Sequence, residues 1–275
     1  MNLTEVDNCP HQRHMRRAPG YDRRGPNRIL KDLFVRYKTN AGEGLAHRTE
    51  TVIDSKGNQI GAELLIMHKS LSVDTVLGGM IEKGTTFNLF ALGVMRAFDA
   101  TKRGGLGYRS VNAYVADIID PDFRYLIAKL VTFYTKQERS NVVIELLEYE
   151  HGNLNGEFIK NVKWLRELGF QVKIDDCDIL GIDKNGVSMK ILEAVGSEYD
   201  GLKIDHRTSN EITQGGLSIA FKNRLGERVK SLLSGKQSIT AEGIQSSTDI
   251  GELWRTLGVT KFQLAPAQYR KRREK

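Results

Sequence analysis

Cysteine and proline are scarce in this sequence, and long apolar runs are absent from it. The two cysteines, Cys9 and Cys177, lie too far apart to suggest a disulfide framework, and such low usage fits a reducing, cytoplasmic compartment. No apolar run approaches the about 18 residues that cross a bilayer, so we expect no membrane span and no membrane partner. The first residues also lack a compact apolar segment behind their charges, and we therefore expect no secretory signal.

The 275 residues carry a net charge of +7, and the positive excess is concentrated towards both ends. Residues 11–38 hold nine lysines and arginines against two acidic residues, and residues 269–275 hold five basic residues. We interpret residues 1–44 as a mobile basic arm in which residues 27–38 form a short helix, and residues 269–275 as a basic tail. Such ends are either solvated or in contact with nucleic acid or a protein partner.

Between these ends, strand-like and helix-like segments alternate. Residues 47–54 and 58–66 are joined by a short connection that contains Gly57, which predicts an antiparallel hairpin. Six further strands are expected at 108–115, 141–150, 171–176, 199–205, 236–242 and 259–265. Helices are expected at 86–102, 122–136, 158–169, 187–196, 216–234 and 249–257. This alternation predicts right-handed crossovers and a parallel sheet, and eight strands are enough to close an α/β barrel.

Acidic side chains stand where five of the expected strands end. They are Glu63, Glu145, the pair Asp175 and Asp176, Asp205, and Glu242. Asn112, Lys203 and Gln263 lie at strand ends as well. Because the carboxyl ends of barrel strands share one mouth, we expect these side chains to converge there. Carboxylate and amide oxygens are hard ligands, which suit Mg²⁺ or Mn²⁺ better than zinc.

The residue types at this mouth suggest a division of roles. The adjacent carboxylates of Asp175 and Asp176 can each serve one of two ions, and paired ions favour in-line phosphoryl displacement. The ammonium of Lys203 can steady a phosphate or an attacking water, and Glu242 can accept the proton of that water. Each residue also has an ordinary alternative: a strand-end acid often caps a helix, a lone lysine forms a structural ion pair, and Asn112 suits a turn.

A resemblance to a known family rests on the order of these motifs. They are GAELL (61–65), VN (111–112), IELLE (144–148), LRELGFQVKIDD (165–176), LKID (202–205), TAEG (240–243) and LGVTKFQ (257–263). Over about residues 45–267 the sequence resembles the EAL family of cyclic di-GMP phosphodiesterases. The resemblance implies a TIM-like (β/α)8 barrel at residues 45–268 with an antiparallel first strand. It also implies hydrolysis of cyclic di-GMP to linear pGpG with two Mg²⁺ or Mn²⁺ ions, and a homodimer.

The resemblance assigns roles to particular positions. Glu63 matches the glutamate that names the family motif, here in ELL, and with Asn112, Glu145 and Asp175 it matches the metal ligands. Asp176 matches the ligand of the second ion. Lys203 matches the lysine beside the attacking water, and Glu242 matches a ligand or base. The substrate and loop positions are Glu148, which anchors the loop after the Asp pair, together with Asp205, Gln245 and Gln263.

The sequence also departs from the family pattern on the substrate side. The family loop DDFGTGYSS reads DDCDILGID at residues 175–183, and Met67 replaces an arginine that contacts substrate phosphate. Gln245 replaces a second glutamate, and the early Gln-Pro pair is missing, with Glu50 and Thr51 nearby. Three hypotheses follow: an active cyclic di-GMP phosphodiesterase, a catalytically impaired EAL-like module that binds a protein or nucleotide, and an unrelated Mg²⁺-dependent barrel hydrolase or lyase.

Overall fold

A computed structural model of the chain describes residues 45–68, 86–104, 107–147, 154–180, 187–233, 235 and 237–265. Four expectations lie outside these residues: the basic arm at 1–44, its helix at 27–38, the tail at 269–275 and the loop anchor Glu148. Among the described helices, none is both long enough and apolar enough to cross a membrane.

The chain enters the barrel through an antiparallel hairpin. Strands β1 (Leu45–Asp54) and β2 (Gln59–His68) pair with Glu50 opposite Glu63. The side chain of Asp54 closes the turn by accepting hydrogen bonds from the backbone N–H groups of Lys56 and Asn58 at 2.8 and 2.9 Å. The hairpin predicted from the sequence is confirmed.

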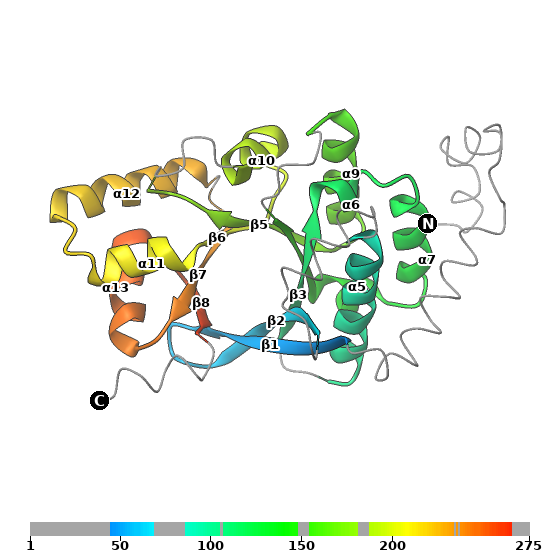
Figure 1. Cartoon of the computed structure of the whole chain (residues 1–275), viewed down its shortest axis with the longest axis horizontal. Coiled ribbons are helices and arrows are strands. Elements are labelled where there is room, and N and C mark those ends of the chain that lie inside the picture. Colours follow the sequence, from blue (N-terminus) through cyan, green and yellow to red (C-terminus); the bar gives the residue numbers. More distant parts are fainter. Residues whose placement is uncertain are drawn as a thin grey trace.

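The remaining strands complete a closed barrel in chain order (Figure 1). They are β3 (Tyr108–Tyr114), β4 (Val142–Leu147), β5 (Gln171–Cys177), β6 (Gly201–Ile204), β7 (Ser238–Ile244) and β8 (Lys261–Leu264). Neighbours from β2 to β8 pair in parallel, whereas β1 pairs antiparallel with both β2 and β8. The expected TIM-like barrel with an antiparallel first strand is therefore confirmed.

Helices surround the strands from β3 onwards (Figure 1). They are α5 (Thr86–Lys102), α6 (Val115–Ile118), α7 (Phe123–Val131), α8 (Lys136–Ser140), α9 (Gly156–Glu167), α10 (Val187–Val195), α11 (His206–Gln214), α12 (Ile219–Leu232) and α13 (Ser247–Leu257). In α9, for example, Phe158, Val162 and Leu165 recur at helical spacing and are all buried. Asn155 caps the start of this helix, and Gly169 adopts a positive φ just beyond its end.

One helix was missed, and one helix prediction was wrong in its bounds. The helix expected at 216–234 is preceded by a separate helix, α11, which Asp205 caps by accepting the N–H of Thr208. This helix was missed because it is polar and Ile212 is its one large apolar residue. The helix expected at 122–136 ends at Val131, and a capping box formed by Thr135 and Glu138 starts α8.

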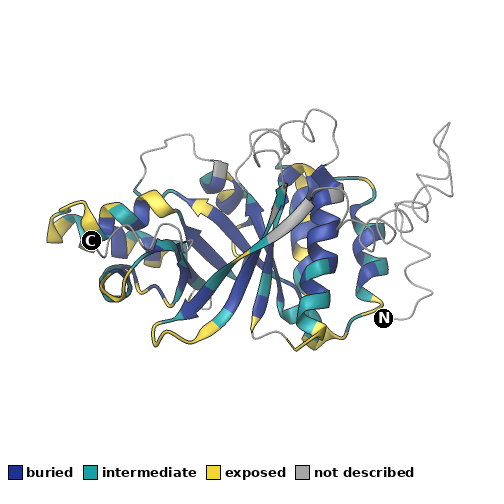
Figure 2. Cartoon of the chain, turned by 60° about the horizontal axis from the view of Figure 1, so that its bottom comes forward, coloured by how far each residue is buried: buried dark blue, intermediate teal, exposed yellow. Residues whose placement is uncertain are grey.

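Two apolar regions hold the barrel together. The larger lies between the strands and the helices, where buried residues line the inward sides of the helices (Figure 2). The smaller is formed by Val52, Tyr108 and Val143, with Ile60 packed against them. The ring of Tyr108 fits because Gly61 has no side chain, since a Cβ there would stand 2.7 Å from the ring.

The carboxyl group of Asp117 in α6 gives a testable dependence of stability on pH. It accepts hydrogen bonds from Thr86 Oγ1 at 2.6 Å and from the Tyr114 N–H at 2.9 Å. Burial nevertheless raises the pKa of Asp117 from 3.8 to about 6. The stability linked to its protonated form is therefore present below pH 3.8 and is lost as the pH rises through about 6.

We therefore expect the free energy of unfolding of wild type, minus that of Asp117→Asn, to fall by about 2 to 3 kcal/mol between pH 4 and pH 7. Chemical denaturation of both proteins across this range measures the difference. Taking the difference cancels the titration of other groups and any constant cost of the asparagine. A difference that does not change with pH would show that Asp117 titrates normally.

Candidate active site

The carboxyl ends of the parallel strands bring polar side chains into one buried cluster. Each of seven consecutive strands supplies one: Glu63 (β2), Asn112 (β3), Glu145 (β4), Asp175 (β5), Lys203 (β6), Glu242 (β7) and Gln263 (β8). They face the barrel interior because side chains alternate along a strand and these positions share one face. Residues that are up to 200 positions apart in sequence, such as Glu63 and Gln263, are joined here by hydrogen bonds.

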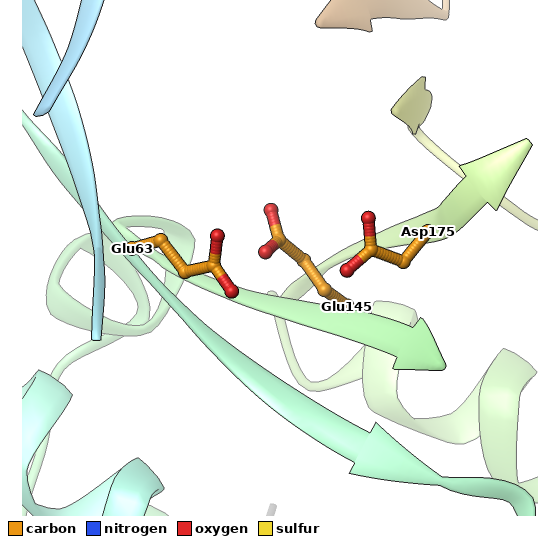
Figure 3. A group of neighbouring side chains, drawn as sticks. All are labelled: Glu63, Glu145 and Asp175. Carbon is orange, nitrogen blue, oxygen red and sulfur yellow. The ribbon is translucent and has the colours of Figure 1, made fainter. Parts of the chain in front are cut away.

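Three of the carboxylates form a compact group. Glu63, Glu145 and Asp175 each offer an oxygen atom such that these atoms all lie within 4.8 Å of one another. Their side chains point towards one another from strands β2, β4 and β5 (Figure 3). All three residues are buried, so their mutual repulsion is weakly screened by water.

The ammonium group of Lys203 stands among these carboxylates. Its Nζ lies 3.2 Å from Glu63 Oε2, 3.0 Å from Glu145 Oε2 and 3.0 Å from Asp175 Oδ1. A fourth carboxylate, that of Glu242, lies 2.7 Å from it. Burial alone would lower the pKa of Lys203, but the four carboxylates raise it well above its usual value. The lysine is therefore held in its charged form.

The pKa values of the four carboxyl groups are shifted in different directions. Burial raises the pKa of Glu145 to about 7 even though Lys203 opposes the shift. Burial likewise raises the pKa of Asp175, and it raises that of Glu242 well above the usual value. The pKa of Glu63 is lowered: burial opposes this, but Lys203 and the amides of Gln263 and Asn112 outweigh it. The cluster thus holds more carboxylate than its lysine can neutralise.

Two amide side chains hold Glu63 in place. Asn112 Nδ2 donates to Glu63 Oε1 at 3.0 Å, and Gln263 Nε2 donates to Glu63 Oε2 at 2.7 Å. Gln263 also donates to Glu50 Oε2 at 2.9 Å. The other end of the Asn112 amide, Oδ1, is buried and accepts no hydrogen bond from any residue that the structure describes. An orphaned acceptor beside three carboxylates fits a hard divalent cation such as Mg²⁺ or Mn²⁺.

A second lysine lies against the same cluster from inside the barrel. Lys173 Nζ is 3.7 Å from Glu145 Oε1 and 3.2 Å from both Tyr108 Oη and Thr240 Oγ1. It precedes Asp175 by two residues on β5, so both side chains face the interior. Sequence reasoning missed this residue, although the alternation along β5 carries the signal.

Two β-bulges shape the mouth. Asp175 and Asp176 of β5 stand against the single residue Lys203 of β6. Glu242 and Gly243 of β7 stand in the same way against Gln263 of β8. The second residue of each bulge has a positive φ, 48° at Asp176 and 72° at Gly243. Bulges of this kind re-aim side chains next to active sites.

The bulge on β5 separates the two adjacent aspartates. Asp175 is buried in the cluster, whereas Asp176 is exposed and does not belong to the compact group of three carboxylates. At Gly243 the bulge leaves room for the ring of His206, since a Cβ there would stand 1.9 Å from the ring. The assignment of Asp176 to a second ion stays a prediction.

Two further positions singled out in the sequence lie in or beside helix caps. Asp205 accepts the N–H of Thr208 at 2.9 Å and also its hydroxyl, which accounts for an aspartate at this position. The backbone N–H of Gln245 donates to Asp249 at 3.1 Å near the start of α13. The prediction that these residues contact substrate stays untested.

Comparison with known proteins identifies the fold. No family model matches the sequence, and no curated protein matches it. An EAL domain protein from Listeria monocytogenes has a similar structure, with a TM-score of 0.67 at 16% sequence identity, over 86% of this chain and 96% of that chain. The fold is that of EAL domains.

Two further solved structures share the EAL-type barrel of this chain. The PaMucR phosphodiesterase, in a c-di-GMP complex, has a TM-score of 0.65 at 17% identity and covers 88% of this chain and 99% of that chain. A standalone EAL protein from Vibrio cholerae, in its c-di-GMP-bound form, has a TM-score of 0.60 at 20% identity and covers 80% and 89%. The fold that the sequence resemblance implies is thereby confirmed.

We expect Mn²⁺ or Mg²⁺ to raise the melting temperature of the wild-type protein, because a cation that binds only the folded state stabilises it by mass action. At about 100 times its dissociation constant the gain is about 2.7 kcal/mol. Glu145→Gln should abolish the shift yet leave the metal-free protein near wild-type stability, because glutamine mimics the protonated glutamate. Thermal melts with and without metal test this, and exposed Glu227→Gln is the matched control. A full shift in Glu145→Gln would exclude Glu145 as a ligand.

Lys173→Met should bind Mn²⁺ more tightly than wild type, by about 10-fold, because it removes a buried positive charge beside Glu145. Isothermal titration calorimetry with Mn²⁺ measures the affinity directly, without any assay of activity. Lys190→Met removes the same charge from the exposed face of α10 and should leave the affinity unchanged. An unchanged affinity in Lys173→Met would mean that this lysine only fills space in the barrel.

Proposed function

We propose that this chain is a divergent member of the EAL family and hydrolyses cyclic di-GMP to linear pGpG. The observation that carries the proposal is the convergence of seven strand-end side chains, from Glu63 to Gln263, in the order that the sequence resemblance requires. The EAL-type fold supports it because the same mouth of the barrel would receive the substrate.

The donor set divides into residues that would hold two ions. Glu63, Asn112, Glu145 and Asp175 would hold the first, and Asp176 with Glu242 would complete the second. When bound, Mg²⁺ or Mn²⁺ supplies Lewis-acid neutralisation of phosphate charge and acidifies water. The nature of the ions, their number and the contribution of Asp176 all belong to the proposal.

Two further residues would orient the attacking water and accept its proton. We assign to the ammonium of Lys203 the positioning of the water that attacks phosphorus, because it stands at the centre of the cluster. We assign to Glu242 the acceptance of the proton that this water loses. Burial raises the pKa of Glu242 well above its usual value, so its carboxylate is a stronger base than that of an ordinary glutamate. The phosphorus–oxygen bond to the ribose breaks as the bond to water forms, and the leaving oxygen takes a proton from solvent.

The second candidate is an EAL-like module that binds a nucleotide or protein partner without hydrolysis. Two sequence features favour it: the altered loop at residues 175–183 and Met67 in place of a phosphate-contacting arginine. A cytoplasmic location, a homodimer and a protein partner for the basic residues 1–44 are further parts of the proposal. Each of these awaits its own measurement.

Wild-type protein incubated with cyclic di-GMP and Mn²⁺ should form pGpG, measured by chromatography of the nucleotides. Glu63→Ala and Glu242→Gln should each lower the rate more than about 100-fold, because each removes a carboxylate from the cluster. Glu227→Gln should retain full activity. If the nucleotide stays unchanged at high wild-type concentration but calorimetry detects binding, the proposed enzyme is wrong and the second candidate, a binding module, is supported. Neither turnover nor binding would overturn both candidates.

A further inference from the structure

Arg48 lies at the rim of the carboxylate cluster. Because β1 runs antiparallel to its neighbours, its first residues stand at the mouth where the parallel strands end. Val52 lies in the barrel interior, Glu50 stands opposite Glu63, and Arg48 stands opposite Leu65. Side chains two residues apart share a face, so Arg48 is one step further out than the cluster on the same inward-facing side.

Hydrogen bonds tie this guanidinium to the cluster. Arg48 Nη2 donates to Glu50 Oε1 at 2.5 Å. The other oxygen of Glu50 accepts from Gln263 Nε2, which also donates to Glu63 Oε2. Only two side chains, those of Glu50 and Gln263, therefore separate Arg48 from Glu63. The arginine is held in a fixed orientation relative to the carboxylates.

Among the residues that the structure describes, only Glu50 forms a hydrogen bond with this guanidinium. The contact with Glu50 uses one carboxylate oxygen, whereas a guanidinium carries five N–H groups in a planar fork. Arg48 Nε is buried and has no acceptor among the residues that the structure describes. The side chain as a whole is 41% exposed. A planar fork whose remaining donors meet no acceptor in the described part of the chain is matched to the paired oxygens of a phosphate.

The charge pattern of the mouth favours such a cation. An anionic substrate that approaches the cluster meets the carboxylates of Glu50, Glu63 and Glu242. The ammonium groups of Lys173 and Lys203 are almost fully buried among their carboxylate partners. Four residues after Glu63 on β2, opposite Ala46 and nearer the carboxyl end of the strand, stands the uncharged Met67. Arg48 is thus the one lysine or arginine within strands β1 and β2.

We propose that Arg48 binds a non-bridging oxygen pair of a substrate phosphodiester at the mouth of the barrel. This inference rests on the proposed function and adds a substrate-binding residue to it. Arg48 makes no contact with the three compact carboxylates themselves, so it contributes binding and not chemistry. The lost contact should therefore appear in KM and leave kcat nearly unchanged.

The test compares Arg48→Met and Arg48→Lys with wild type in steady-state hydrolysis of cyclic di-GMP with Mn²⁺. Arg48→Met should raise KM by about 10- to 100-fold and change kcat by less than about 3-fold. Arg48→Lys keeps the charge but loses the fork, and it should raise KM by about 3- to 10-fold. Lys56→Met removes a charge from the turn at the opposite end of the same hairpin and should leave KM unchanged.

A second readout separates substrate binding from a structural role. If Arg48 only braced Glu50 and Gln263, its loss would disturb Glu63 and weaken Mn²⁺ binding. We expect the Mn²⁺ affinity of both variants, measured by calorimetry without nucleotide, to match that of wild type. If Arg48→Met does not fold, Arg48→Lys carries the same comparison.

The outcomes separate the role of Arg48 from the proposed hydrolysis of cyclic di-GMP. A wild-type KM in Arg48→Met, or a loss confined to kcat and Mn²⁺ affinity, overturns the role of Arg48 and leaves the phosphodiesterase standing. A wild-type protein that neither hydrolyses nor binds cyclic di-GMP overturns both. A raised KM with unchanged kcat and Mn²⁺ affinity supports the inference.

Discussion

The carboxylate end of this barrel depends on one buried ammonium group. The Nζ atom of Lys203 touches carboxylates from β2, β4, β5 and β7 at distances of 2.7 to 3.2 Å. Four carboxylates this close would repel one another strongly in a dry interior, and a lone lysine there would lose its proton. The carboxylates keep the lysine charged, and the charged lysine reduces the repulsion between the carboxylates. The position of this ammonium therefore fixes where the strand ends must meet.

The backbone adapts to this arrangement through its two bulges. In a regular strand, adjacent residues point to opposite faces, and an extra residue interrupts this alternation and changes the direction of the side chains beside it. The bulges at Asp175–Asp176 and Glu242–Gly243 place an extra residue beside Lys203 and Gln263 respectively. The irregular backbone thus occurs where polar side chains must be aimed, and the regular strands below it carry the apolar residues Val52 and Val143.

Much of this arrangement could be predicted from the sequence because strand ends are readable from patterns. Alternating apolar runs and helices gave the eight strands, and the parallel crossovers then required Glu63, Glu145 and Asp175 to share one mouth. The register in which neighbouring strands pair cannot be predicted from these sequence patterns. The link from Glu50 through Gln263 to Glu63 joins positions more than 200 residues apart and became visible only in the barrel. Helix α11 was missed because capping and polar contacts, not an apolar stripe, define it.

The antiparallel first strand has a consequence for how the domain is connected. In a barrel whose strands all run parallel, the chain enters at the end opposite the active mouth. Here Leu45 begins β1 on the side of the carboxylates, so the polypeptide that precedes it is tethered at the same opening. The residues before Leu45, which include the nine basic residues between 11 and 38, are therefore joined to the barrel at its carboxylate end and not at the opposite end.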